Sequence, residues 1–215
     1  MSKSTKKKQP SAAQVPKTDK QYLAAGMARR LPVAQCWLNP NWREGGLATL
    51  IVARQHKNGN YTLGTYLIDV FCLGLKQTSY RVNETAQQYD FVVNYLFTEQ
   101  KKVPVDYVLA HNIIYGGIAY ANELGFKPDK DWALSQYVLQ PDDEETDLLE
   151  LEFGKDGKPF YISGPHDKPM EIIAKLEKTI GTGNFHYILQ ADDDNEFDLD
   201  NFLDDDNDES ALNAI

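Results

Sequence analysis

The amino-acid sequence predicts an α+β fold: a single domain with a mainly antiparallel sheet covered by helices and flanked by disordered tails. Three observations support this prediction. Apolar, β-branched runs gather in the first half of the chain, before most of the helical patterns, and such grouping is typical of α+β folds. An Asn-Gly pair separates two of these runs, and it is the strongest short-range signal of a β-hairpin. The two ends of the chain contain too few large apolar side chains to offset the entropy of ordering.

The chain of 215 residues divides into a basic arm (1–20), a globular domain (21–190) and an acidic tail (191–215). The arm has six lysines against one acid, and the tail has eleven acids and no basic residue. Of the formal net charge of −10, the arm carries +5 and the tail −11, which leaves −4 for the domain. The low pI is therefore mainly a property of the tail.

The first half of the domain is predicted to form strands. A short helix over 20–30, with Thr18 as N-cap, precedes them. The predicted strands are 33–38, 47–56 and 61–72, and the Asn58-Gly59 turn joins the last two.

The second half is predicted to be mostly helical, with one layer of helices on one sheet. The predicted helices are 84–98, capped by Asn83; 105–124, opened by Pro104; 130–139, capped by Asp129; and one that Pro169 opens and Gly181 ends, capped by Asp167. A hairpin over 149–162 around Asp156-Gly157 and a closing strand over 184–189 complete the prediction.

The candidate catalytic residues are Asp69, Cys72, Lys76 and His111. Asp69 is a charged residue within an apolar strand, so its carboxylate needs a partner, which Lys76, His111 or Arg54 could supply. One hypothesis is a small hydrolase or transferase in which Cys72 is the nucleophile and His111 the base. The alternative is that Cys72 is a buried small side chain beside a structural ion pair, and His111 a hydrogen-bonded core residue.

The candidate ligand-binding residues are Trp37, Trp42, Arg43 and Tyr115. The two tryptophans flank an Asn-Pro-Asn segment and Arg43 follows, a pattern that suits the rim of a small-ligand site. Tyr115 precedes Gly116-Gly117 within a predicted helix, where glycine indicates the close approach of a ligand or of another backbone. The alternatives are that the tryptophans seal one end of the sheet and that the glycines permit tight helix–sheet packing.

The candidate partner-binding residues lie in the acidic tail: Phe197, Leu199, Phe202 and Leu203. Large apolar side chains among acids suit a segment that docks on a basic, grooved partner protein. This pattern favours a non-enzymatic interaction or regulatory protein over the enzyme and over a ligand-sensing domain. The alternative is a solubilising tail that screens the basic arm.

Several function classes are disfavoured. The histidines are scattered and the two cysteines are not paired at metal-site spacing, so neither a metal nor a cofactor is expected. The net charge of −4 makes direct nucleic-acid binding by the folded domain unfavourable. No apolar run is long enough to span a membrane and no secretory signal is visible, so a cytoplasmic location is expected.

Four runs are similar to a widespread family of uncharacterised bacterial proteins: CWLNPNWREGGLATLIVAR, YLIDVFCLGLK, HNIIYGGIAYANELGFKPDKDW and FGKDGKPFYISGP. The resemblance covers about residues 33–190 and leaves out both charged ends. It implies a bacterial cytoplasmic origin and no particular activity.

Overall fold

The computed structural model describes residues 17–143 and 146–190. Residues 1–16 of the predicted arm and the whole tail, with its candidate residues Phe197, Leu199, Phe202 and Leu203, lie outside these ranges. The last four residues of the predicted arm are described, and a helix begins at Asp19. Along the chain the elements are α1 (Asp19–Ala24), η1 (Ala28–Arg30), β1 (Val33–Leu38), α2 (Trp42–Gly45), β2 (Leu47–Gln55), β3 (Tyr61–Asp69), β4 (Gly74–Glu84), α3 (Ala86–Leu96), β5 (Val103–Val105), α4 (Tyr107–Glu123), α5 (Trp132–Ser135), η2 (Gln136–Val138), β6 (Phe160–Ile162), α6 (Pro169–Ile180) and β7 (His186–Ile188).

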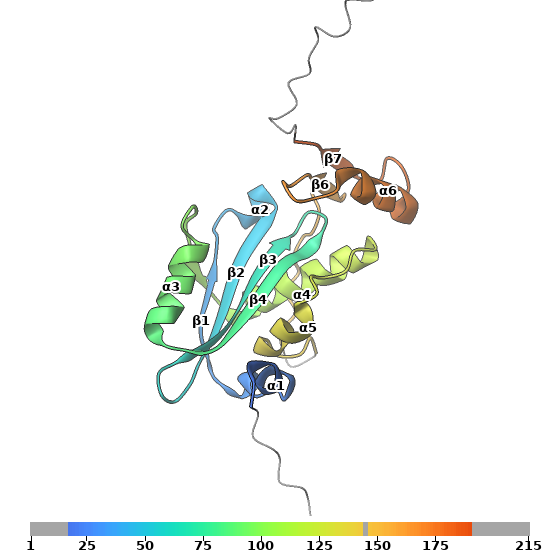
Figure 1. Ribbon diagram of the computed structural model, residues 1–215. Helices are drawn as coiled ribbons and strands as arrows, with labels where there is room; N and C mark the ends of the chain where they lie inside the picture. Colours follow the sequence, from blue (N-terminus) through green and yellow to red (C-terminus); the bar gives the residue numbers. More distant parts are fainter. Residues whose placement is uncertain (1–16, 144–145, 191–215) are drawn as a thin grey trace, which may run out of the picture.

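The main sheet is five-stranded and antiparallel, in the order β4-β3-β2-β1-β5, and it confirms the predicted α+β class (Figure 1). The Asn58-Gly59 turn joins β2 and β3 as predicted, with Gln55 opposite Tyr61. Gly59 has φ +86°, and the Asn58 side chain accepts a hydrogen bond from the Asn60 N–H. These features hold β2 and β3 in a long, regular hairpin.

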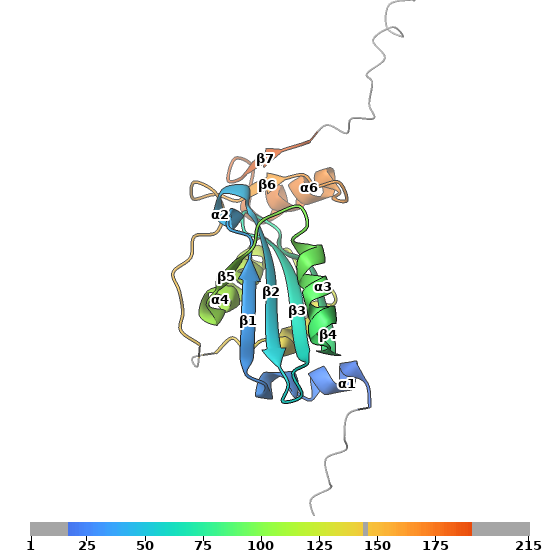
Figure 2. The same ribbon diagram turned by 90° about the vertical axis from the view of Figure 1, so that its left-hand side faces the viewer.

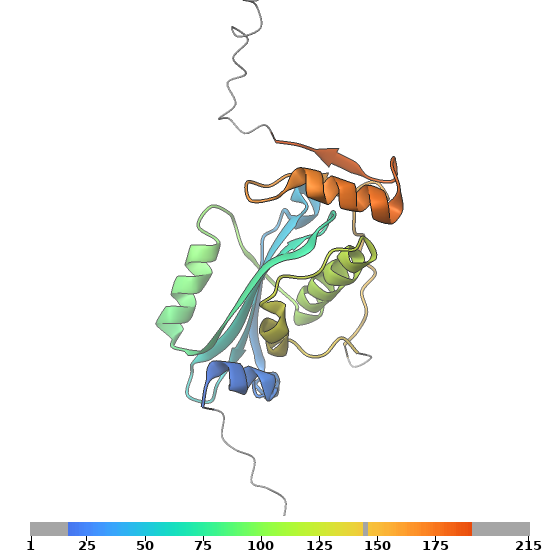
Figure 3. The same cartoon turned by 45° about the vertical axis from the view of Figure 1, so that its right-hand side comes forward.

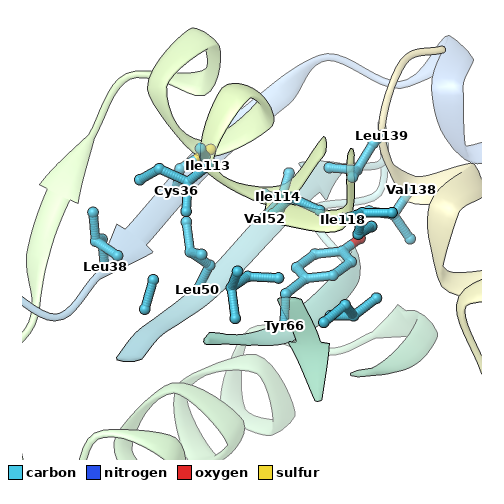
Figure 4. Close-up of a cluster of buried hydrophobic side chains, with 14 of the residues drawn as sticks. Cys36, Leu38, Leu50, Val52, Tyr66, Ile113, Ile114, Ile118, Val138 and Leu139 are labelled. Carbon is cyan, nitrogen blue, oxygen red and sulfur yellow. The ribbon is translucent and has the colours of Figure 1, made fainter. Parts of the chain in front are cut away.

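Helices cover both faces of this sheet, so the prediction of one helical layer is wrong (Figure 3). On one face, α4 packs over alternate residues of the strands, among them Leu50, Val52 and Tyr66 (Figure 4). On the other face, α3 packs over Ile51, Ala53 and neighbouring side chains. The apolar run of β2 is uninterrupted because the strand is buried on both faces, but such a run alone does not distinguish a strand of this kind from a buried helix.

The glycine pair of α4 permits tight packing, as one of the two sequence interpretations predicts. A Cβ atom on Gly117 would lie 2.5 Å from Ile68 Cγ2 in the sheet, and one on Gly116 would lie 2.6 Å from the Phe153 ring. The packing of sheet and loop against α4 therefore accounts for both glycines, and no ligand is required to explain them.

Strand β4 is absent from the sequence prediction, which places no element at 74–82. Thr78, Tyr80 and Val82 alternate inward along it, but only two of them are apolar, so the period-2 signal is weak. Asn83 belongs to β4 rather than capping α3. The cap is Thr85, which forms a capping box with Gln88.

Further boundaries differ from the prediction. The predicted helix 130–139 is the short α5 followed by η2, and its N-cap is Asp131 rather than Asp129. Pro104 lies in β5, opposite Trp37, and Asp106 is the N-cap of α4. The predicted hairpin over 149–162 is reduced to a tight turn at Asp156-Gly157, closed by a bridge between Lys155 and Lys158, and to the short strand β6.

The segment β6–α6–β7 forms a separate two-stranded parallel sheet at one end of the main sheet, where α6 connects the strands (Figure 1). Backbone hydrogen bonds tie it to the β3–β4 turn: Gly154 N–H to Val70 O at 2.9 Å, and Phe160 N–H to Phe71 O at 3.0 Å. An apolar cluster that includes Cys72, Tyr161 and Leu176 fills the junction.

The two ends of the described chain lie at opposite ends of the main sheet, with α1 at one end and β7 at the other (Figure 2). The basic arm and the acidic tail are therefore attached far apart on the domain.

Candidate functional site

Asp69 is the last residue of β3, and its side chain accepts hydrogen bonds from the turn that leads into β4. Its Oδ1 accepts hydrogen bonds from the backbone N–H groups of Phe71 at 2.9 Å and Cys72 at 3.0 Å. The side chain is only 6% exposed, and this burial raises its pKa to about 6, although the backbone hydrogen bonds and Lys76 act in the opposite direction.

Lys76 does not form an ion pair with Asp69. Its Nζ binds both carboxylate oxygens of Asp167, at 2.9 and 3.0 Å. Asp167 also accepts from the Gly164 N–H at 2.9 Å and from the Tyr161 hydroxyl at 3.4 Å. Asp167 therefore joins β4 to the β6–α6–β7 unit instead of capping α6, whose N-cap is Lys168.

Arg54 is not the partner of Asp69 either. Its buried guanidinium donates to the backbone carbonyls of Val138 and Leu31 and lies over the Tyr107 ring. Burial lowers its pKa. Arg54 thus fixes the segment after α5 to the sheet, a structural role.

Cys72 and His111 are not brought together. The Cys72 thiol is 0% exposed, and burial, with a contribution from Asp69, raises its pKa far above the usual range. His111 lies in α4, where its Nε2 is 3.3 Å from the Pro141 carbonyl oxygen and its ring packs between Tyr107 and Tyr115. A thiolate nucleophile needs an accessible site and an adjacent base, and this arrangement provides neither.

Both cysteines are expected to be unreactive in the folded protein. Cys36 is also buried, and its pKa is raised to about 12 by burial. Titration with a thiol reagent at pH 8 should modify neither residue until denaturant is added, after which both should react. A fast native reaction that the Cys72→Ser variant removes would contradict this placement.

The four candidate ligand-binding residues separate into three places. Trp37 lies on the α3 side of the sheet and donates from Nε1 to the Tyr89 hydroxyl at 2.9 Å. Tyr115 lies on α4 and donates to the Gln140 carbonyl at 3.1 Å. Only Trp42 and Arg43 line a common cavity, where the guanidinium lies 4.7 Å from the centre of the Trp42 ring.

This cavity, the Trp42 cavity, has a volume of about 230 Å³ and lies between α2 and the turn at Asp156-Gly157. Its wall holds two cations and three acids: Arg43, Lys155, Glu44, Glu152 and Asp156. The Lys155 Nζ lies 5.0 Å from the centre of the Phe160 ring and 5.8 Å from that of Phe71. The excess of acids makes the wall weakly negative.

A second cavity of about 360 Å³, the Asp69 cavity, shares Phe71 with the first. Its wall is largely apolar, with Leu47, Phe71, Phe160 and Ile162, and its charged residues are Asp69 and Lys76. The last described residue, Gln190, also lines it, so the chain leaves the described domain at this cavity.

Sequence reasoning identified Asp69 and Lys76 but not the rest of this site. Asp167 is 91 residues from Lys76 in the chain, and nothing in the local pattern of either residue indicates the pair. Phe160 and Lys155 lie in the run 149–162, which the sequence predicts only as a hairpin. Their adjacency to Phe71 depends on the docking of the C-terminal unit.

Within residues 17–143 and 146–190, no group of three or more His, Cys, Asp or Glu side chains is arranged to hold a metal ion. In the same part of the chain, none of the helices has the length and apolar character needed to cross a bilayer. Comparisons of the chain with protein-family models, with curated proteins and with solved structures found no match.

Proposed function

We propose that this is a non-enzymatic interaction or regulatory protein of the bacterial cytoplasm, which binds a basic partner through β7 and the acidic segment that follows it. The observation that carries the proposal is the exposed apolar surface at the end of the domain: Tyr187 is 50% exposed, Ile188 52% and Leu189 47%. Three consecutive large apolar residues with this exposure are typical of an interaction site.

The backbone of β7 supports the same reading. His186 donates to Pro159 O at 2.9 Å, and Ile188 accepts from Ser163 N–H at 3.0 Å, so the even-numbered residues face β6. The backbone groups of Tyr187 and Leu189 point the other way, where no strand pairs with β7 among the described residues. An extended segment of a partner could add here as a third strand.

The negative charge of residues 191–215 indicates that the partner is basic. The eleven acids of 191–215 begin at Asp192, three residues after Leu189, and between them lie Phe197, Leu199, Phe202 and Leu203. A partner segment that carries lysine or arginine together with apolar pockets would match both features. The resemblance to a family of uncharacterised bacterial proteins covers the domain only and is neutral on this point.

Deletion of the acidic segment is the direct test. A chain that ends at Gln190 should lose the proteins that the full chain captures at moderate salt. Replacement of Phe197, Leu199, Phe202 and Leu203 by serine, which keeps all eleven acids, should also weaken capture, because the apolar anchors are lost. An identical set of captured proteins for all three chains would overturn the proposal. If the serine variant still captures the partner proteins and releases them at higher salt, the tail binds through its negative charge alone, without apolar anchors.

A small-ligand-sensing role is a second candidate, and the convergence of Trp42 and Arg43 on one cavity favours it. A ligand that enters the Trp42 cavity should change the fluorescence of Trp42, and the Trp42→Phe variant should lose that change. A hydrolase or transferase built on Cys72 and His111 has no comparable support.

A further inference from the structure

We propose that the Asp69 cavity binds a primary ammonium group carried on an apolar stem. The inference does not depend on the acidic segment or on the partner proposed above. It is based on the charge of the cavity wall, on its aromatic lining, and on the lack of a side-chain cation for Asp69.

The charge of the cavity favours a cation. Lys76 is neutralised by the two-oxygen contact with Asp167 at 2.9 and 3.0 Å. Asp69 has no salt bridge within the described part of the chain: Lys76 acts on it only at longer range, and the hydrogen bonds to its Oδ1 come from backbone N–H groups. A buried carboxylate without a directly bound cation is unfavourable, and an ammonium group in the cavity would supply one.

The walls favour an apolar stem. Phe71 and Phe160 lie with ring centres 6.0 Å apart and tilted by 41°, and Leu47 and Ile162 extend the apolar surface. A volume of about 360 Å³ is in the range of small-ligand sites. The protein already places one ammonium over these two rings from the neighbouring cavity, that of Lys155, so their geometry suits a cation–π contact.

An anionic ligand is disfavoured by the same residues. To bind Lys76 it would have to compete with Asp167, and it would lie in the same cavity as the Asp69 carboxylate, which repels an anion. A role for Asp69 in the turn alone is the other alternative. It predicts that no cation binds, because the backbone hydrogen bonds to Oδ1 need an acceptor but not a charge.

Calorimetric titration of the full chain at pH 7.5 with three probes of one shape tests the proposal: phenethylammonium, the neutral phenethyl alcohol and the anion 3-phenylpropionate. The cation should bind with a dissociation constant on the order of 1 mM or below, and the other two at least about tenfold more weakly. Asp69→Asn keeps the Oδ1 acceptor and removes the charge, so it should weaken the cation at least about tenfold. The matched control is Glu152→Gln in the Trp42 cavity, which should change the affinity by less than about twofold.

A second arm distinguishes the source of the ammonium group. An acetylated Leu-Lys-Leu amide presents the ammonium group of a lysine side chain, whereas phenethylammonium is a small free amine. Binding of either probe to the wild type, together with weaker binding to Asp69→Asn, supports the proposal. It is overturned if no cationic probe binds, if the neutral or anionic probe binds equally well, or if folded Asp69→Asn binds like the wild type. Should Asp69→Asn not fold, the comparison of the three probes on the wild-type chain decides alone. The chain that ends at Gln190 should still bind phenethylammonium in preference to the alcohol and the anion, and this preference separates the site from the tail.

Discussion

The Asp69→Asn variant is expected to be more stable than the wild type at pH 7, by up to about 3 kcal/mol. Burial raises the pKa of Asp69 from its ordinary value of 3.8 to about 6, and each pKa unit corresponds to about 1.4 kcal/mol. Asparagine keeps an oxygen for the N–H groups of Phe71 and Cys72 without the cost of a buried charge. Urea unfolding of both chains at pH 7 measures the difference.

The pH dependence gives the same test a second readout. The folded state holds the Asp69 proton up to about pH 6, whereas the unfolded state releases it near pH 3.8, so the folded state binds more protons between these values. This residue therefore makes the wild type less stable as the pH rises through that window, and the variant should lack that contribution.

The other groups that face Asp69 do not titrate in this window in a way that would mimic it. The pKa values of Cys72, Tyr120 and Tyr161 are all raised by burial, away from this window. The difference between the two chains should shrink to about 0.5 kcal/mol at pH 4 and to nearly zero about one pH unit lower. A variant that is less stable at pH 7, or a constant difference across the window, would contradict a costly buried charge. If Asp69→Asn is more stable than the wild type and no longer binds phenethylammonium, the Asp69 carboxylate lowers the stability of the fold and is required for binding.

Gly74→Ala is expected to destabilise the protein by about 3 kcal/mol. Gly74 has φ +67°, a conformation that L side chains rarely adopt. A Cβ atom there would also lie 2.5 Å from Ala121 Cβ and 2.8 Å from the Gly117 carbonyl oxygen, both in α4. Because the contact is with helix backbone, relief requires a shift of α4 away from the start of β4. The midpoint of thermal or urea unfolding measures the loss.

Gly59→Ala is the matched control. Gly59 has φ +86° in the β2–β3 turn, but no atom lies within 4 Å of the position that its Cβ would occupy. It should therefore cost only the conformational term, about 1 kcal/mol. Equal losses in the two variants would mean that the contact between Gly74 and α4 does not contribute.

The antiparallel sheet could be predicted from the sequence because its signals are local. The Asn58-Gly59 turn has the residues that positive φ angles require, and the flanking runs are rich in β-branched residues. The turn at Asp156-Gly157 is local in the same sense. Gly116-Gly117 in α4 likewise indicated a close contact, although the sequence could not say with what.

The missing parts depend on tertiary contacts. Strand β4 has few apolar residues, and its pairing with β3 supplies what its own sequence lacks. The second helical layer covers Ile51 and Ala53, on the face of β2 opposite Leu50 and Val52. The continuous apolar run of β2 does not show from sequence alone whether it forms a strand buried on both faces or a buried helix. The parallel pairing of β6 with β7 across α6 has no local signal at all.

The candidate site was predicted in part for the same reason. Asp69 is conspicuous in the sequence as a charge within an apolar strand, and the structure places it at a cavity. The rest of the site was not predictable, because only the docked C-terminal unit brings Phe160 to the cavity and Asp167 to Lys76. Cys72 was a candidate nucleophile because it follows the end of a predicted strand, but the docked C-terminal unit buries it.

The central claim is that β7 and the acidic segment together bind a basic partner, and amide hydrogen exchange at β7 tests it most directly. The full chain is compared alone and with the partner that it captures. The account predicts slower exchange at Tyr187 and Leu189, whose N–H groups point away from β6, with little change at His186 and Ile188, which already face it. Unchanged exchange at Tyr187 and Leu189 in the saturated complex would contradict it.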